Sequence, residues 1–145
     1  MGMKVNLDTN IFISVKNKEE DSFFCGMILD AIDENKIKGV ISTIVIAEVL
    51  VGFFKNKENY EAERFLNRIL ANYEIIPVNI EVSRIAAIIK SKTDIRLPDA
   101  IVSATTEYSK SDFLISKDLP LIKKVKYIAI NPKDFVENYL SNKNE

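Results

Sequence analysis

Four carboxylate side chains lie in or beside apolar stretches, where an acid has no simple structural reason to be: Asp8, Glu48, Asp99 and Asp118. Burying an unpaired carboxylate costs several kcal/mol, and such a group usually takes up a proton instead. If the four converge, a hard divalent cation such as Mg²⁺ or Mn²⁺ is the ligand that best balances their charge. The sequence therefore predicts a metal site built from carboxylates.

The chain contains no histidine, so the commonest general base and the commonest Zn²⁺ ligand are both missing. What remains is metal-assisted chemistry carried out by carboxylates. We expect Asp8 and Asp99 to bind the ion directly, and Glu48 and Asp118 to act through water or a second ion. Without metal, we expect a raised pKa at Asp99 or Glu48.

Each acid also has a simpler explanation when it is taken alone. Asp8 would cap a following helix, and Glu48 would lie at the edge of its helix or form a salt bridge. Asp99 would balance the dipole of its helix, and Asp118 would stabilise a turn. A shared site is favoured because all four can be placed at one edge of one parallel sheet, where ligands bind beyond the carboxyl ends of the strands.

Other acids fit that edge less well. Asp112 begins the strand that Asp118 follows, so about 15–20 Å of strand separates them at ~3.3 Å per residue. Glu81 fits the first turn of a helix. The remaining candidates lie in polar, solvated contexts: Asp94, Glu107 and residues 19–21. None of these is expected to be a ligand.

Short apolar runs alternate with longer amphipathic ones, which predicts an α/β fold with a mainly parallel sheet. The expected strands are 3–7, 40–41, 75–78, 113–115 and 127–130. The expected helices are 22–34, 44–54, 60–72, 82–89, 97–108 and 132–140. We predict a single domain over residues 1–145, with a polar tail at 141–145.

The composition is that of a globular protein, with 47% hydrophobic and 28% charged residues. The single Cys25 excludes an internal disulfide and favours a reducing compartment. No apolar run approaches the ~20 residues of a membrane span, and the first residues lack a signal-peptide profile. These features predict a cytoplasmic protein that does not use a membrane. The net charge of −1 means that any nucleic acid must be bound by local basic clusters.

Basic and aromatic side chains near the acids are candidates for holding such a substrate. The possible phosphate contacts are Arg96, Lys117, Lys123 and Lys124. Each of them is better explained as a solvated surface charge, because basic residues are scattered along the whole chain. The possible base-stacking residues are Phe12, Phe53 and Phe54. Aromatics at helical spacing more often form core or interface, and for Phe53 and Phe54 we expect a dimer interface.

The segments around the four acids resemble PIN-domain nucleases, and among these the VapC-type toxins. The matching segments are 6–11 (NLDTNI), 42–52 (STIVIAEVLVG), 97–105 (LPDAIVSAT) and 114–118 (LISKD). They occur in the family's order, and the similarity extends over about residues 3–140. Each motif is weak alone, but the four together are specific.

The resemblance implies a Rossmann-like α/β/α sandwich around a parallel sheet of about five strands, and a Mg²⁺- or Mn²⁺-dependent endoribonuclease. In such an enzyme a metal-activated water would attack phosphorus in line and leave a 5′-phosphate and a 3′-hydroxyl, a route that needs neither histidine nor a ribose 2′-hydroxyl nucleophile. The family's four catalytic, metal-binding acids match the four carboxylates named above. Its hydroxyl two positions before the last acid, usually Thr, is Ser116 here. Thr9 and Asn10 match polar residues that support the first acid. The implied partners are an RNA substrate, a small antitoxin whose tail enters the active-site groove, and a second copy in a homodimer.

Alternatives from other classes fit less well. A haloacid-dehalogenase-type phosphatase needs a second Asp two positions after the first, where this chain has Asn10. A receiver-like phosphoacceptor domain needs a Lys after a late strand, and Lys117 lies directly beside Asp118. Two alternatives remain within the PIN fold: a nuclease of RNA maturation or turnover, and a catalytically silent scaffold that binds RNA or protein. An adjacent antitoxin reading frame would distinguish a toxin from the former.

Overall fold

The computed structural model describes residues 2–140 and contains one five-stranded, fully parallel sheet. The strand order is β3-β2-β1-β4-β5. The strands are β1 (Lys4–Leu7), β2 (Lys38–Ser42), β3 (Tyr73–Ile76), β4 (Phe113–Ile115) and β5 (Ala129–Ile130). The expected α/β fold with a parallel sheet of about five strands is confirmed. The predicted polar tail, 141–145, lies outside the described residues.

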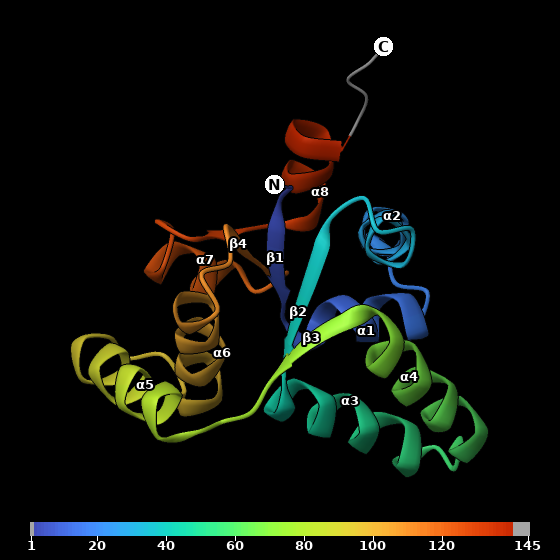
Figure 1. Ribbon diagram of the computed structural model, residues 1–145, viewed down its shortest axis with the longest axis horizontal. Helices are drawn as coiled ribbons and strands as arrows, with labels where there is room; N and C mark the ends of the chain where they lie inside the picture. The colour runs from blue at the N-terminus through green and yellow to red at the C-terminus, as the bar shows by residue number, and fades with distance from the viewer. Residues whose placement is uncertain (1, 141–145) are drawn as a thin grey trace.

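Helices cover both faces of the sheet. They are α1 (Thr9–Lys16), α2 (Ser22–Asp33), α3 (Thr43–Lys55), α4 (Asn59–Asn72), α5 (Ile80–Lys92), α6 (Leu97–Tyr108), α7 (Leu119–Lys124) and α8 (Pro132–Phe135). Figure 1 shows α5 and α6 on one side of the sheet and α1, α2 and α4 on the other, and α6 packs on β1, β4 and α5. Within residues 2–140, no helix is long and apolar enough to cross a membrane.

The central strand β1 is enclosed on both faces of the sheet. Val5 and Leu7 are fully buried, as expected for a parallel strand covered on both faces. The buried Asn6 lies between them, and its side-chain amide donates to the carbonyl of Val102 (3.1 Å) and to Thr106 Oγ1 (3.0 Å). These bonds fix β1, which leads into Asp8, against α6.

The structure differs from the expected elements at several places. Two helices that the sequence analysis did not assign, α1 and α7, begin directly after Asp8 and Asp118. Strand β3 begins at Tyr73 and ends at Ile76 instead of covering 75–78, because Pro77 has no N–H for a strand ladder. Strand β5 is limited to Ala129–Ile130. The last helix is α-helical only to Phe135 and continues as a π-helical segment, Val136–Leu140.

Candidate active site

The four candidate acids come from four separate segments at the carboxyl edge of the sheet. Asp8 follows β1, Glu48 lies on α3, Asp99 lies in the first turn of α6, and Asp118 follows β4. All four line one pocket of about 430 Å³, which we call the acid pocket. Its other lining residues are Thr9, Asn10, Ile13, Val51 and Arg96. The parallel topology brings these acids together because every strand ends at the same edge.

Asp8 is the most deeply buried of the four acids, with 6% of its surface exposed. One carboxylate oxygen accepts the backbone N–H of Thr9 (2.8 Å) and caps α1. The other accepts from the Ser116 hydroxyl (2.8 Å) and from the Asn10 side-chain amide (3.4 Å). Asp8 therefore both caps α1 and lines the acid pocket.

Burial raises the pKa of Asp8 to about 6, although hydrogen bonds from Ser116 and Thr9 oppose the rise. The nearby negative charges of Asp99 and Glu48 raise the pKa further. A buried carboxyl among other acids gains most from a cation, because the cation relieves both desolvation and repulsion. The sequence analysis expected such a shift at Asp99 or Glu48 and did not expect it at Asp8.

Asp99 is also held in a partly buried position. Burial raises its pKa, the guanidinium of Arg96 opposes the rise, and the charges of Asp118 and Glu48 add to it. Arg96 Nε lies 3.5 Å from a carboxylate oxygen of Asp99. The expected upward shift at Asp99 therefore has the same two causes as at Asp8, burial and like charge.

Hydroxyl groups fix the other two acids. Thr9 Oγ1 donates to Glu48 Oε1 at 2.5 Å. Asp118 caps α7 by accepting the N–H of Leu121 (3.1 Å), and its own N–H donates to Ser116 Oγ (3.0 Å). The Thr9 hydroxyl therefore holds Glu48, and the Ser116 hydroxyl holds both Asp8 and Asp118.

The chemistry of the donor set fits a hard divalent cation. Four carboxylates line the acid pocket with one basic side chain, Arg96, and carboxylate oxygen is the ligand that Mg²⁺ and Mn²⁺ prefer. Within residues 2–140, no three acidic or cysteine side chains are grouped closely enough to hold an ion as they stand. The acids form the walls of the pocket, as mutual repulsion between carboxylates favours.

The candidate phosphate-binding residues lie in different places. Arg96 lines the acid pocket, and 73% of its side chain is exposed. Lys117 does not line it, because its ammonium contacts Glu19 (2.6 Å) and Asp21 (2.9 Å). Partial burial lowers the pKa of Lys117, but hydrogen bonds to these two carboxylates outweigh this and raise it. Lys124 forms an ion pair with Asp94, and Lys123 lies in the last turn of α7.

Two acids that the sequence analysis excluded do not line the acid pocket. Asp112 accepts the backbone N–H of Lys4 at 2.8 Å, at the opposite end of β1. Glu81 pairs with Arg84 at 3.4 Å in the first turn of α5. Neither residue lines the acid pocket. Their exclusion followed from strand direction and helix position alone.

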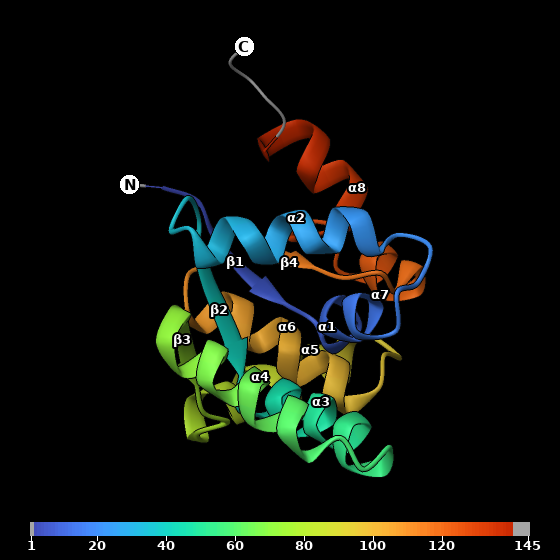
Figure 2. The ribbon, with the colours of Figure 1, turned by 90° about the vertical axis from the view of Figure 1, so that its right-hand side faces the viewer.

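A larger groove, of about 640 Å³, lies among α1, α2, α3 and α4, and we call it the α1–α4 groove. Figure 2 faces this side of the molecule, with α2 and α4 on either side of α1. Phe65 lies at its centre and contacts the ring of Phe12 edge to face (5.4 Å) and the ring of Phe53 (5.9 Å). These two candidate stacking residues therefore belong to this groove, whereas Phe54 is 51% exposed on α3. The sequence analysis did not identify the groove, because its walls come from four helices.

A profile of the PIN domain matches residues 5–126 of the chain. Among solved structures, FitAcB from Neisseria gonorrhoeae is 25% identical and superposes with a TM-score of 0.72, covering 89% of this chain and 98% of that one. VapBC2 from Rickettsia felis, bound to a DNA fragment from its promoter, is 24% identical with a TM-score of 0.68 and coverages of 89% and 98%. A toxin–antitoxin complex from Klebsiella pneumoniae is 23% identical with a TM-score of 0.69, covering 88% of this chain and 97% of that one. Comparison with curated proteins gives no significant match.

The family match and the fold lead to the same identification. The matched residues 5–126 cover most of the chain and include all four acids. The structural neighbours are VapC and FitB toxins of toxin–antitoxin complexes, and they share the parallel sheet and most of the chain length. The resemblance noted in the sequence motifs is thereby confirmed: the chain belongs to the PIN domain family.

Proposed function

We propose that this protein is a Mg²⁺- or Mn²⁺-dependent endoribonuclease that cleaves RNA to 5′-phosphate and 3′-hydroxyl ends. The observation that carries the proposal is the convergence of four carboxylates from four segments on one pocket. Four acids beside one arginine would repel an RNA phosphate unless a cation balanced them. Membership of a family whose domains typically are nucleases and bind divalent metal supports the same activity.

Each charged residue of the acid pocket has a role in this proposal. Asp8 and Asp99 hold the metal, with Glu48 and Asp118 acting through water or at a second ion. The bound ion would supply the positive charge that activates water and stabilises the departing 3′ oxygen. Arg96, exposed at the pocket, contacts a phosphate of the RNA.

The supporting residues orient the acids before any ligand arrives. The Thr9 hydroxyl fixes one oxygen of Glu48, and Ser116 and Asn10 fix one oxygen of Asp8. Partners of this kind typically contribute 10–100-fold, or about 1.4–2.7 kcal/mol, to metal affinity or activity. Ser116 therefore serves the proposed site as the family's Thr would.

The test is cleavage of labelled single-stranded RNA with and without Mg²⁺ or Mn²⁺. We expect metal-dependent cleavage that EDTA stops, and a loss of more than about 100-fold in Asp8→Asn and in Asp99→Asn. Glu81→Gln is the control, because it removes an exposed acid that does not line the acid pocket. Cleavage that persists in EDTA, or in both Asn variants, would contradict the proposed site.

We also propose that the protein is the toxin of a type II toxin–antitoxin system. The support is its likeness to chains solved in such complexes. Induced expression is expected to arrest growth, the Asp8→Asn variant to lose this effect, and co-expression of an adjacent small antitoxin gene to restore growth. Unimpaired growth with an active nuclease would favour RNA maturation or turnover instead.

A homodimer is the assembly that we propose for this chain. Its support is Phe54 on α3, a large apolar side chain that is 51% exposed and does not line the acid pocket. Light scattering after gel filtration should give twice the chain mass, and Phe54→Glu should reduce it to that of a monomer. The control Phe23→Glu changes a still more exposed ring, on α2 (69% against 51%). A monomeric parent protein would refute the assembly.

A further inference from the structure

The segment 116–118, between β4 and α7, determines the position of two of the four acids. Ser116 Oγ donates to Asp8 at 2.8 Å and accepts the N–H of Asp118 at 3.0 Å. Lys117 lies between them but does not line the acid pocket. The contacts that hold residue 117 therefore also determine the positions of Asp8 and Asp118.

The Lys117 ammonium is bound by the connection between α1 and α2. It lies 2.6 Å from Glu19 Oε1 and 2.9 Å from Asp21 Oδ1. Ser14, a fully buried residue of α1, donates its hydroxyl to the same oxygen of Asp21 at 2.8 Å. Only 21% of the Lys117 side chain is exposed, so this cluster is more shielded than an ordinary surface ion pair.

The backbone of Lys117 is held by α1. Its N–H donates to Asn10 Oδ1 at 3.0 Å. The amide nitrogen of Asn10 contacts Ser116 Oγ (3.3 Å) and Asp8 Oδ2 (3.4 Å). Segment 116–118 is thus attached at two points, to α1 through the backbone and to the α1–α2 connection through the ammonium.

We propose that Lys117, Glu19 and Asp21 form a brace that holds segment 116–118 against α1, so that Ser116 and Asp118 keep their places at the acid pocket. Lys117 is then a positioning residue. A phosphate contact would require its ammonium to leave two carboxylates. The consequence for metal binding and cleavage rests on the proposed nuclease function, whereas the holding of the segment does not.

The test compares Lys117→Met with Lys16→Met. Lys117→Met removes the ammonium and keeps most of the apolar stem, and Lys117→Arg keeps the charge. Lys16→Met is the matched control, because Lys16, the last residue of α1, also forms a shielded ion pair, with Glu58 at 2.9 Å, and does not line the acid pocket. All variants are measured as the full chain.

The first measurement is amide hydrogen exchange by NMR at residues 117 and 118. In Lys117→Met we expect exchange there to accelerate about tenfold or more, with the amides of β1 unchanged. Mn²⁺ affinity by calorimetry should fall about tenfold, as for loss of other supporting contacts. In cleavage, kcat should fall while KM for RNA stays the same. Lys16→Met should leave all of these unchanged, and Lys117→Arg should remain close to the parent protein.

A double variant tests whether Lys117 and Asp21 act as a unit. If the brace works through Asp21, Lys117→Met with Asp21→Asn should be no worse than Lys117→Met alone. Unchanged exchange and Mn²⁺ affinity in Lys117→Met would overturn the brace, and a raised KM with unchanged exchange would replace it with a phosphate contact. If the parent protein neither bound Mn²⁺ nor cleaved RNA, the proposed function would fail, and exchange alone would decide whether the segment is held.

Discussion

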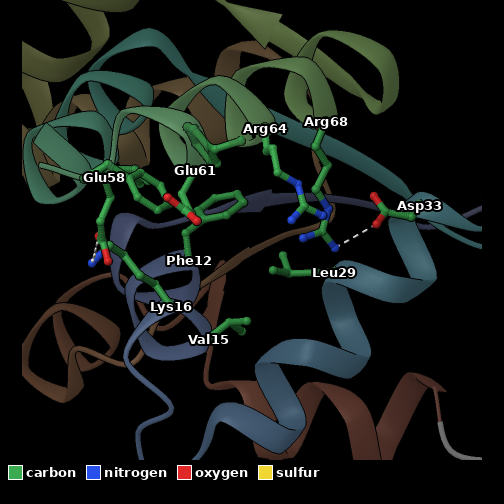
Figure 3. Close-up of a pocket in the computed structure, with 12 residues that line it drawn as sticks. Phe12, Val15, Lys16, Leu29, Asp33, Glu58, Glu61, Arg64 and Arg68 are labelled. Atoms are coloured by element: carbon green, nitrogen blue, oxygen red, sulfur yellow. Dashed lines mark ion pairs between the residues drawn. The ribbon is translucent and has the colours of Figure 1, made fainter.

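The acid pocket and the α1–α4 groove are lined by the same kinds of charged side chain but balance them differently. The groove has three basic and three acidic residues in its lining: Lys16, Arg64, Arg68, Asp33, Glu58 and Glu61. Figure 3 shows Arg68 reaching from α4 to Asp33 on α2, an ion pair of 2.7 Å. The acid pocket has four acids and one arginine. The groove is neutralised within the protein, whereas the acid pocket contains more acids than bases, an excess that the proposed cation would balance.

The largest expected effect comes from removing one acid from each region. Asp8→Asn should reduce RNA cleavage more than about 100-fold, and Asp33→Asn should change it less than about threefold. Stability should respond in the opposite order. In the metal-free protein at neutral pH, Asp8→Asn removes a buried charge and should raise the free energy of unfolding, whereas Asp33→Asn should lower it by about 1 kcal/mol. Urea unfolding of both variants measures this, and equal losses of stability would remove the distinction.

The pH dependence of stability sharpens the same comparison. The folded-state pKa of Asp8 is about 6 against an ordinary 3.8, so folding is favoured by protonation of this group. Its contribution is fully present below about pH 4 and is lost as pH rises through about 6, a change of about 3 kcal/mol. The difference in unfolding free energy between the parent protein and Asp8→Asn should therefore grow from pH 5 to pH 7.5.

Saturating Mn²⁺ should cancel this pH effect in the parent protein, since a ligand at 100 times its Kd stabilises by about 2.7 kcal/mol. Urea midpoints at several pH values, with and without Mn²⁺, provide the measurement. If the difference in unfolding free energy between the parent protein and Asp8→Asn did not change with pH, burial would not raise the pKa of Asp8.

An intermediate effect is expected from Ser116, which has no counterpart in the groove. Ser116→Ala removes the hydroxyl that donates to Asp8 and accepts from Asp118, and Mn²⁺ affinity should fall about 10-fold. Ser116→Thr keeps the hydroxyl and should retain most of the affinity. Calorimetry distinguishes the two variants. Equal losses would attribute the effect to packing of the buried side chain and not to the hydrogen bonds.

The acid pocket could be predicted from the sequence because local patterns contain most of the necessary information. The apolar run of β4 has the predicted bounds, Phe113–Ile115, and Lys4–Leu7 begins one residue later than expected. Parallel strands then place Asp8 and Asp118 at one edge. Glu48 was recognised because Glu rarely occurs in so apolar a helix without a partner.

Features that depend on long-range packing could not be predicted. Helices α1 and α7 have eight and six residues, too few for a helical period to stand out. Lys117 reaches Glu19 across 98 positions of the chain, and nothing near either residue indicates that pairing. The deep burial of Asp8 likewise follows from how α1 and segment 116–118 close over it. The sequence therefore predicted which acids gather but not which one is most buried.

The smallest expected effect concerns one arginine from each region. Arg96 lies at the acid pocket and Arg64 at the groove; both are exposed, so neither substitution should disturb the fold. If RNA crosses only the acid pocket, Arg96→Gln should raise KM a few-fold and reduce the slope of log affinity against log salt by about 1, while Arg64→Gln should change neither. Fluorescence anisotropy with a non-cleavable RNA across a salt series gives both slopes. A reduced slope in Arg64→Gln would show that RNA also follows the groove. The basic residues of the groove would then contact RNA as well as balance the groove's own acids.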